Sequence, residues 1–575
     1  MRLLPFGELP PYQPRRFVPA QLDLGDWPAV APCFDQLEAR LAQVADAAAL
    51  EDWLLDWGEL TAACDEEGAR RYIAMTCHTE DPEAERAYLH FVETVEPELK
   101  PRQFRLEQLY LEHPLRPALN ATRYGVFDRV TAVHVELYRD ANVPLETEEA
   151  KLGQQYQKLT GSLTVRFREQ EQTLVQMARY LEEPDRALRQ AAWELTTERR
   201  LREAATFEDQ FTRLFALRQQ MAQNAGCPNY VGYAFRRMCR FDYTPADCLA
   251  FHAAIEQVVM PVVRELQAER RATMGLDSLR PWDLAVDAQG RPPLKPFQAA
   301  SELIARTQAV FDQLDPVLAA DFRRLQELRL LDLENRKGKA PGGYQYSLSE
   351  ARLPFIFMNA VGVHRDVETL LHEGGHAFHA LATQGEPLYA YRSAPIEFCE
   401  VASMGMELLG SEFLGEFYPA ADAARARREQ FEGILKTLGW IAQVDAFQHW
   451  LYGQPQHTES ERDATWRQLS DCFGGAVDWR GYEPARAKQW HRQLHIFLHP
   501  FYYIEYGIAQ LGALQVWANY RQDPRRGLAA YRAALALGSA RPLPELFATA
   551  GCHFDFSAET LRPLVVLVRE ALDQP

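Results

Sequence analysis

Lysine is scarce in this sequence, and positive charge is outnumbered by negative charge. Eight of the 62 basic residues are lysine and the others are arginine, against 80 acidic residues, which gives a formal net charge of −18. A surface with this excess of negative charge repels phosphate backbones, so we expect no nucleic-acid partner. The net charge does not define the substrate, because a local site can differ in sign from the whole.

Motifs that would place the chain outside the cell or in a membrane are missing. Nine cysteines are present, none of them in a C-x-x-C pair, and the first seven residues lack the apolar stretch of a signal peptide. There is also no uninterrupted apolar run of about eighteen residues, the length that crosses a bilayer. We therefore expect reduced, mostly buried thiols in a cytoplasmic protein with no membrane partner.

Helical periodicity is what the sequence has in abundance. Its 575 residues are 47% hydrophobic and 25% charged, an ordinary balance for a globular protein. Apolar residues recur at helical spacing in long segments, namely 33–64, 66–78, 82–97, 145–180, 184–225, 245–274, 297–329, 420–452 and 505–537. We predict a mainly α fold, divided into an N-terminal helical lobe (1–190) and a catalytic helical lobe (191–575).

Strand signals are few and gather in one place. Residues 343–348 and 354–359 flank a short turn and predict an antiparallel pair, and residues 162–167 alternate as a further short strand. The pair could offer unpaired backbone groups to an extended peptide, or it could be a small structural hairpin. The glycine-rich segment 335–343 before it fits a mobile lip over a site as well as it fits a solvated surface loop.

The clearest chemical signal is an H-E-x-x-H pentad at residues 372–376. On a helix, His372 and His376 lie on one face about one turn apart, so both imidazoles can bind one metal ion. Glu373 leaves the same helix beside the first ligand, where it can deprotonate a water that the metal activates. Two imidazoles and an open position suit Zn²⁺. The alternative is an ordinary helix with two surface histidines and a solvated glutamate.

A third protein ligand is needed, and the residues alone leave its identity open. Four glutamates follow the pentad: Glu386, Glu397, Glu400 and Glu407. Glu386 is in a turn close to the end of the pentad helix. The other three fall on one apolar helix, expected at 393–409, where a carboxylate is costly to bury unless it binds a cation or a proton. Any of these three could be the ligand while the others position it.

The pentad helix also has features of close packing. A glycine inside a helix costs about 1 kcal/mol relative to alanine, so Gly374 and Gly375 suggest close approach by another helix or by a substrate backbone. His379 lies two turns after His372 and could face the same way. We interpret it as a core or surface histidine, because the ligand count is met without it.

Polar aromatic residues gather again between 495 and 506. This short segment contains His495, His499, Tyr502, Tyr503 and Tyr506. Neutral imidazole N–H and phenol O–H donors suit the negative charge that develops on a carbonyl oxygen during amide hydrolysis. The alternative is an aromatic cluster that only packs beneath the following helix.

Taken together, these segments resemble the oligoendopeptidase F branch of the thimet oligopeptidase family of zinc metallopeptidases. The resemblance is carried by APGGY at 340–344, the strand at 354–359, TLLHEGGHAFH at 369–379, PIEFCEVASM at 395–404 and PFYYIEYGIAQLGA at 500–513, with NAG at 224–226 and RFDYTP at 240–245. Recognisable pieces cover roughly 150–575, whereas the first hundred residues contribute little.

The resemblance implies a role for the candidate residues. The ligands of a single zinc ion would be His372, His376 and Glu400, and the catalytic residues would be Glu373, His495, Tyr503 and Tyr506. Glu373 would act as general base, and Tyr506 is the first choice for the oxyanion. The resemblance assigns no role to His499, and those of Glu397, Glu407 and His379 stay open.

The implied fold has two helical lobes that enclose a deep channel with zinc at its floor, with the small hairpin beside the zinc helix. Such a channel admits short unfolded oligopeptides and excludes folded proteins, so the expected function is a zinc endopeptidase. One alternative is a helical zinc carboxypeptidase, although no Arg or Lys stands out to bind a C-terminal carboxylate. Another is a peptide-binding protein with a vestigial zinc site, against which the complete set of base and ligands argues. The sequence indicates neither the oligomeric state nor the cleavage preference.

Overall fold

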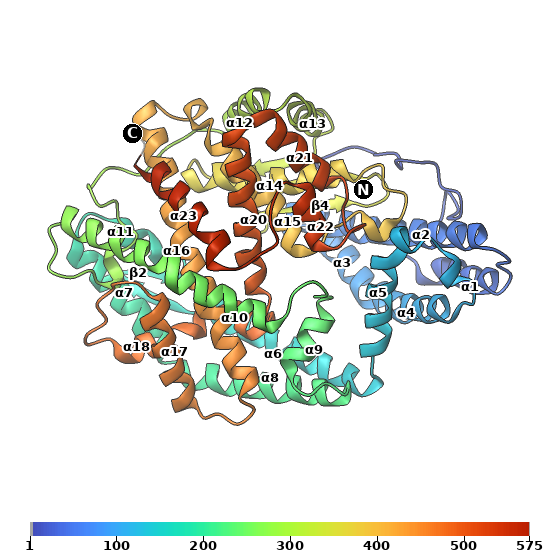
Figure 1. Ribbon diagram of the computed structural model, residues 1–575, viewed down its shortest axis with the longest axis horizontal. Coiled ribbons are helices and arrows are strands. Elements are labelled where there is room, and N and C mark those ends of the chain that lie inside the picture. Colours follow the sequence, from blue (N-terminus) through green and yellow to red (C-terminus); the bar gives the residue numbers. More distant parts are fainter. Residues whose placement is uncertain (1–3, 574–575) are drawn as a thin grey trace.

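The computed structural model describes residues 4–573, of which most are helical, and this confirms the mainly α prediction (Figure 1). One end of the molecule, at the right of Figure 1, is made by the first helices: α1 (Trp27–Leu41), α2 (Ala47–Cys77), α3 (Pro82–His90), α4 (Glu96–Glu112) and α5 (Ala121–Leu137). α1, α2, α4 and α5 bury a core of their own, in which Phe34, Trp53 and Tyr110 are inaccessible to solvent.

The chain continues in helices most of which share a second and larger core, whereas the helix at 186–201 packs through Ala192 in a small third cluster. They are α6 (Val143–Ser162), α7 (Arg186–Leu201), α8 (Ala204–Asn224), α9 (Tyr230–Arg237), α10 (Pro245–Ala254), α11 (Met260–Thr273), α12 (Ala300–Leu314), α13 (Pro316–Glu327), α14 (His364–Ala382), α15 (Ile396–Ser411), α16 (Ala420–Gly453), α17 (Glu459–Phe473), α18 (Glu483–Ala487), α19 (Leu494–Leu498), α20 (Tyr503–Gln522), α21 (Pro524–Leu535), α22 (Leu543–Thr549) and α23 (Ala558–Leu572). The family-like motifs all fall within this part of the chain. The predicted division at residue 190 stays a prediction.

The predicted continuous helix at 145–180 is wrong. Helix α6 ends at Ser162, and an antiparallel hairpin follows, formed by β1 (Thr164–Phe167) and β2 (Gln170–Thr173). Arg168 and Glu169 in its turn have φ values of 51° and 64°, a left-handed conformation that a right-handed helix cannot include. The strand predicted over 162–167 is therefore confirmed.

A three-stranded sheet stands before the pentad helix. Its order is β3 (Leu331–Glu334), β5 (Leu353–Ala360), β4 (Tyr344–Leu348), so β5 is central and β4 lies at an edge. β4 and β5 are antiparallel, with Tyr344 opposite Phe357, which confirms the predicted hairpin. β3 runs parallel to β5. The sequence does not predict β3, because four residues at the end of a helical segment carry too short a pattern.

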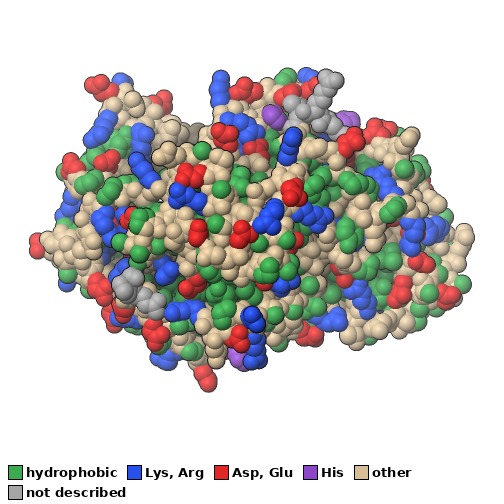
Figure 2. Space-filling model, turned by 90° about the horizontal axis from the view of Figure 1, so that it is seen from above, with side chains coloured by type: hydrophobic (Ala, Val, Ile, Leu, Met, Phe, Trp, Pro, Cys, Tyr) green, Lys and Arg blue, Asp and Glu red, His purple; other side chains and the backbone are tan. Residues whose placement is uncertain are grey.

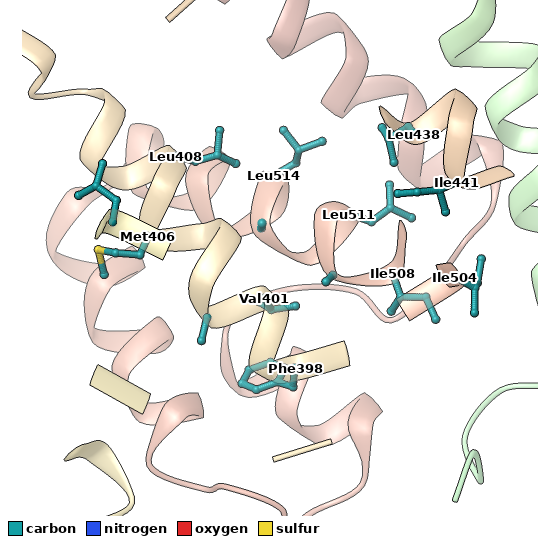
Figure 3. Close-up of a cluster of buried hydrophobic side chains, with 14 of the residues drawn as sticks. Phe398, Val401, Met406, Leu408, Leu438, Ile441, Ile504, Ile508, Leu511 and Leu514 are labelled. Carbon is teal, nitrogen blue, oxygen red and sulfur yellow. The ribbon is translucent and has the colours of Figure 1, made fainter. Parts of the chain in front are cut away.

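Three helices after the sheet form an apolar layer. α14 packs on α15, α15 packs on α20, and α16 covers α20 from the other side. Figure 3 shows the buried side chains between them, which include Phe398, Val401 and Leu408 of α15, Leu438 and Ile441 of α16, and Ile508, Leu511 and Leu514 of α20. We call α14, α15 and α20 the apolar layer, because buried hydrocarbon side chains fill the space between them outside the pentad.

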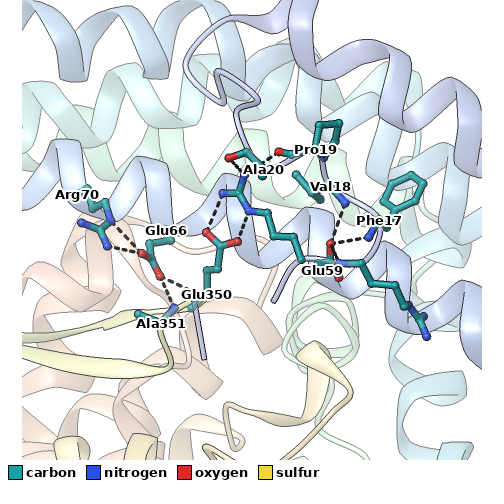
Figure 4. Close-up of polar contacts among 12 residues, drawn as sticks. Phe17, Val18, Pro19, Ala20, Glu59, Glu66, Arg70, Glu350 and Ala351 are labelled. Carbon is teal, nitrogen blue, oxygen red and sulfur yellow. Dashed lines mark hydrogen bonds and ion pairs between the residues drawn. The ribbon is translucent and has the colours of Figure 1, made fainter. Parts of the chain in front are cut away.

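Polar contacts join α2 to the sheet. Glu66 accepts hydrogen bonds from the backbone amides of Glu350 and Ala351, at 2.8 and 2.7 Å, and forms an ion pair with Arg70 (Figure 4). Arg15 in turn donates to the Glu350 carboxylate, with one N–O distance of 2.9 Å. These contacts hold the turn between β4 and β5 against the N-terminal helices.

The segment 335–343 completes this connection; it is a partly exposed loop that is anchored through Lys339 and Ala340. The Lys339 side chain is buried and donates to the Asp332 carboxylate at 2.9 Å. The Ala340 amide donates to the Thr76 carbonyl at the end of α2, at 2.8 Å. We call the contacts of Glu66, Arg15 and this segment the polar seam.

One stretch of residues 4–573, Pro245–Thr273, has the length and apolar composition of a membrane span, with a mean hydropathy of 1.3. It comprises α10, a π-helical turn and α11, and 56% of its most apolar window is buried within the protein. Burial of this kind also occurs in core helices of soluble proteins. On the face shown in Figure 2, acidic and basic side chains are interspersed over the surface.

Candidate metal centre

The pentad lies on α14, whose start is fixed directly to the sheet. The Asp366 carboxylate accepts hydrogen bonds from the backbone amides of Val361, Gly362 and Val363, at 2.8, 2.9 and 3.0 Å. These are free donors of the kind that every helix N-terminus leaves, and a carboxylate there also complements the helix dipole. The link between β5 and α14 is therefore short, and its backbone is held by the Asp366 side chain.

Gly375 allows α14 to approach α15 closely. A Cβ atom at this position would lie 2.5 Å from the Ala402 carbonyl oxygen and 2.6 Å from the Ser403 Cα. At Gly374 a Cβ would be in ordinary contact, 3.5 Å from Phe311. Close helix approach, predicted for both glycines, is thus confirmed at Gly375 only.

This approach brings the three predicted ligands together. His372, His376 and Glu400 each offer one ligand atom within 4.8 Å of the others. His372 Nε2 is 3.5 Å from Glu400 Oε2, and His376 Nε2 is 3.9 Å from the same oxygen. The two imidazole rings are nearly perpendicular, with centroids 4.9 Å apart. Spacing along the sequence had left Glu397 and Glu407 as equal candidates, and neither belongs to this group.

Two of the ligands are held by further polar contacts. His372 Nδ1 is 2.6 Å from Glu407 Oε1 on α15, which leaves Nε2 for the centre. Ser403 donates a hydrogen bond to Glu400 Oε2 at 3.0 Å. Burial lowers the pKa of His372, but the hydrogen bond and charge of Glu407 outweigh it and raise the pKa to about 9 in the metal-free protein. Glu407 is therefore a positioning residue for His372.

Glu373 is buried beside the edge strand of the sheet. Burial raises its pKa to about 7, and the nearby charge of His372 opposes that rise. The backbone of Gln345 on β4 also acts on this carboxyl group, so β4 and Glu373 are neighbours. A carboxyl group with a pKa near 7 can both accept and release a proton at neutral pH.

The tyrosines at the start of α20 have different surroundings. Burial, then the charge of Glu400, raises the pKa of Tyr506 to about 12, and Glu400 is also among the charges that raise the pKa of Tyr502. Their ring centroids lie 5.4 Å apart. Tyr503 is raised in pKa by burial, and the side chains that act on its hydroxyl are Trp440 and Gln493. The charge of Glu400 thus acts on Tyr502 and Tyr506, whereas the ring of Tyr503 lies 5.6 Å from that of Tyr506 and 4.8 Å from that of His495.

His495 belongs to the same aromatic group. Its ring centroid is 5.8 Å from that of Tyr502 and 6.0 Å from that of Tyr506. Burial lowers its pKa to about 4, so the imidazole is neutral at pH 7 and donates one N–H. His499 is more exposed, with its centroid 6.1 Å from that of His495.

A buried polar network behind the ligands escaped the sequence analysis. Arg240 donates to Glu505 Oε1 at 2.8 Å and to the Phe501 carbonyl at 2.5 Å, which fixes the start of α20. Tyr243 donates to Glu397 Oε1 at 2.7 Å, one helical turn before Glu400. Arg240 and Tyr243 lie in the segment RFDYTP, which the sequence analysis noted. The sequence did not predict that their partners are Glu505 and Glu397.

His379 takes no part in the centre. It is buried against Phe398, with ring centroids 6.2 Å apart, and burial lowers its pKa to about 4. This confirms its interpretation as a core histidine. Glu386 lies well away and pairs with Arg123 of α5.

A helical fold with two pentad histidines and a glutamate from the next helix defines the class of helical H-E-x-x-H metallopeptidases. Residues 179–565 match the description "Peptidase family M3", and residues 17–132 match "Peptidase M3 N-terminal domain". The chain belongs to peptidase family M3.

Individual relatives are distant in sequence and close in fold. Oligopeptidase PepF of Bacillus subtilis (strain 168) is 23% identical over 322 residues, 55% of this chain and 47% of that protein. The matched region therefore spans about half the length of that relative. A solved structure assigned to oligoendopeptidase F has a TM-score of 0.86 and 26% identity, covering 97% of this chain and 99% of that chain. PZ peptidase A with an inhibitor gives the same values.

Proposed function

We propose that this chain is a zinc-dependent endopeptidase that hydrolyses internal bonds of short, unfolded oligopeptides. The observation that carries the proposal is the convergence of His372, His376 and Glu400 within 4.8 Å, with Glu373 buried beside them. Relatives named oligopeptidase and oligoendopeptidase F support the same activity. We also propose that the chain acts in the cytoplasm, which its free and mostly buried cysteines favour.

The donor set fits one zinc ion. Ligands at bond lengths of about 2.0–2.1 Å around a tetrahedral ion lie about 3.3 Å apart, and the two N–O separations of 3.5 and 3.9 Å are near that value. His372, His376 and Glu400 would hold the ion. When bound, zinc would polarise the scissile carbonyl and lower the pKa of a water molecule at the site.

Glu373 would move the proton during catalysis. Its carboxylate would take a proton from the attacking water and later give it to the leaving amine. A pKa of about 7, which burial causes, suits both steps. Glu407 would keep His372 Nδ1 occupied, so that Nε2 stays directed at the centre.

Tyr506 and Tyr502 would stabilise the oxyanion, with His495 as a further donor to the substrate. Both phenols stay protonated at neutral pH because burial and the charge of Glu400 raise their pKa values. This assignment replaces Tyr503 of the sequence-based prediction by Tyr502. Tyr503 would instead pack α20 against α16 through Trp440.

The substrate would bind as an extended strand along β4. β4 lies at the edge of the sheet, next to Glu373, so one row of its backbone groups is not paired with another strand. Main-chain pairing of this kind accepts many sequences, as an oligopeptidase requires. We propose as well that the two helical lobes enclose a channel around this strand, and that the channel excludes folded proteins.

Hydrolysis of a quenched fluorescent peptide, blocked at both termini, tests the function. We expect internal cleavage by the wild type, and a loss of at least about 10³-fold in kcat for Glu373→Gln with zinc content unchanged. Exclusive cleavage of an unblocked peptide at its C-terminus would indicate the carboxypeptidase instead. A zinc-loaded wild type that cleaves neither peptide would overturn the proposal.

Phenylalanine variants of the three tyrosines test the choice of donors. We expect Tyr506→Phe and Tyr502→Phe each to lower kcat by about 10²-fold with little change in KM, because they remove a donor needed only in the transition state. Tyr503→Phe is the matched control and should keep nearly full activity. If Tyr503→Phe lowered kcat and Tyr502→Phe did not, Tyr503 would be the donor, as the sequence-based prediction has it.

A further inference from the structure

A second group of metal-ligand side chains lies between α10 and α16. α10 carries Cys248 and His252, and α16 carries Asp445 and His449, so each helix offers two residues four positions apart on one face. The two helices pack together, and Figure 1 shows α10 crossing α16. Cys248, Asp445 and His449 each place one ligand atom within 4.8 Å of the others. Among residues 4–573, this is the second group with that geometry, beside the pentad centre.

The group is dry. Cys248 and Asp445 are fully buried, and the side chains of His252 and His449 are 8% and 9% exposed. Phe235 and Phe501 flank His449, with ring centroids 6.0 and 5.1 Å from it. A polar group in such surroundings is destabilising when it lacks a partner.

Two atoms of the group do lack a partner. Within the described chain, Asp445 Oδ1 and His449 Nε2 make no hydrogen bond. His449 Nε2 lies 3.4 Å from Asp445 Oδ2, close but without hydrogen-bond geometry. The pentad centre also has an imidazole nitrogen close to a carboxylate oxygen: His372 Nε2 lies 3.5 Å from Glu400 Oε2. Ligand atoms that face each other without bonding are arranged to share a cation.

The charges of the group also favour a cation. In the described part of the chain, Asp445 forms ion pairs only with the imidazoles of His252 and His449. One divalent ion with one thiolate and one carboxylate is neutral, which removes the cost of burying a lone carboxylate. A set of sulfur, nitrogen and oxygen donors suits zinc and not magnesium or calcium, which prefer oxygen.

We propose that Cys248, Asp445 and His449 bind a zinc ion that ties α10 to α16 and takes a water molecule in its fourth tetrahedral position. His252 orients the carboxylate, since its Nε2 lies 2.8 Å from Asp445 Oδ2. Binding forms a zinc–sulfur bond and breaks the S–H bond of Cys248, whose proton leaves to solvent. The site is distinct from the pentad centre, with which it shares no residue.

Cobalt substitution separates the two sites, because the pentad centre has no sulfur ligand. The full chain would be produced in cobalt-supplemented, zinc-depleted medium. We expect two cobalt ions per chain and a near-ultraviolet charge-transfer band from thiolate to cobalt. Cys248→Ser and His449→Gln should each lose one ion, and Cys248→Ser should also lose the band. His376→Ala should lose the other ion and keep the band.

Cys399→Ser is the matched control, because Cys399 is the neighbour of Glu400 in sequence and the cysteine most able to mimic the signal. The band should survive in it. One cobalt per chain with no thiolate band in the wild type would overturn the proposal, and so would a band that disappears in Cys399→Ser. In the first case His252, Asp445 and His449 are a hydrogen-bonded core network without an ion. The wild-type spectrum alone shows whether a thiolate binds cobalt, even if Cys248→Ser fails to fold. Neither result bears on peptide hydrolysis by the pentad centre.

Discussion

Two regions next to the pentad are held together by opposite means. On one side the apolar layer brings α15 against α14 through Gly375 and α20 against α15 through buried hydrocarbon. On the other side the polar seam ties α2 to the sheet through Glu66 and Lys339. Close packing fixes distances to a fraction of an ångström, whereas water, salt and protons can replace polar contacts. The ligands lie on the first side, and the edge strand for substrate adjoins the second.

The largest effect should come from filling the α14–α15 contact. Gly375→Ala places a Cβ 2.5 Å from the Ala402 oxygen, so the helices must separate. We expect a loss of about 3 kcal/mol in the free energy of unfolding and of most bound zinc. Gly374→Ala is the matched control: its Cβ meets Phe311 at 3.5 Å and helix propensity improves by about 1 kcal/mol. Urea unfolding and zinc analysis of both variants check this, and equal stability would contradict the packing argument.

Glu407→Gln should weaken the metal site without disturbing the packing. The variant keeps the shape of the side chain but not the charge that holds His372 Nδ1. Loss of such a contact typically costs about 10–100-fold in metal affinity. Competition with a zinc chelator measures it, with the exposed Glu416→Gln as control. Unchanged affinity would show that packing alone positions His372.

The stability of the polar seam should depend on acid more strongly than that of the apolar layer. Burial alone would raise the pKa of Asp332, but hydrogen bonds from Arg336 and Lys339 outweigh it and lower the pKa to about 2. The folded-state value is below the ordinary value of 3.8, so the native state binds fewer protons and its stability falls as pH drops from about 4 to 2. This contribution is about 2 kcal/mol at neutral pH.

Asp332→Asn isolates that contribution. The variant should be less stable than the wild type at pH 7, and the difference in urea midpoint should shrink below pH 4. Asp312→Asn, at a half-exposed pair with Arg323, is the control and should change little. A constant difference across this pH range would assign the acid dependence to other groups.

The smallest effect is expected at the turn between β4 and β5. Glu66→Gln removes the charge that accepts from two backbone amides and pairs with Arg70, which should cost about 1 kcal/mol. Glu67→Gln changes a more exposed pair with Arg71 on the same helix and should cost less. Peptide cleavage should persist in both. A loss of zinc in Glu66→Gln would mean that the seam, and not the apolar layer alone, sets the ligand distances.

Local patterns predicted the parts of the site that lie on single elements. His372, Glu373 and His376 are fixed relative to one another by the helix, and the β4–β5 hairpin follows from its alternation and its turn. Glu400 needed the family resemblance, because Glu397 and Glu407 satisfy the same helical spacing. Which carboxylate faces the imidazoles depends on the rotation of α15, and that is set by contacts such as Gly375 with Ala402.

Residues paired across distant segments could not be predicted. Arg240 and Glu505 lie far apart in sequence, and so do Ala340 and Thr76, which the seam brings together. Tyr503 was taken from the family resemblance and stays a prediction; the choice between it and Tyr502 depends on where α20 starts, because one residue of shift turns a side chain by about 100°. Short strand β3 and the break after Ser162 depended on tertiary pairing and on backbone conformation, which composition does not record.

The packing of α20 on α15 also determines when, during synthesis, the proposed active site can form. The pentad, Glu400 and the tyrosines of α20 leave the ribosome in that order, and α15 has no partner for its second face until Tyr503–Gln522 has emerged. An unfinished chain therefore carries the three proposed zinc ligands but lacks the helix that packs on α15 and the proposed oxyanion donors. Peptidase activity should therefore begin only near the end of synthesis. By then the nascent chain has buried the segments that it could otherwise cleave.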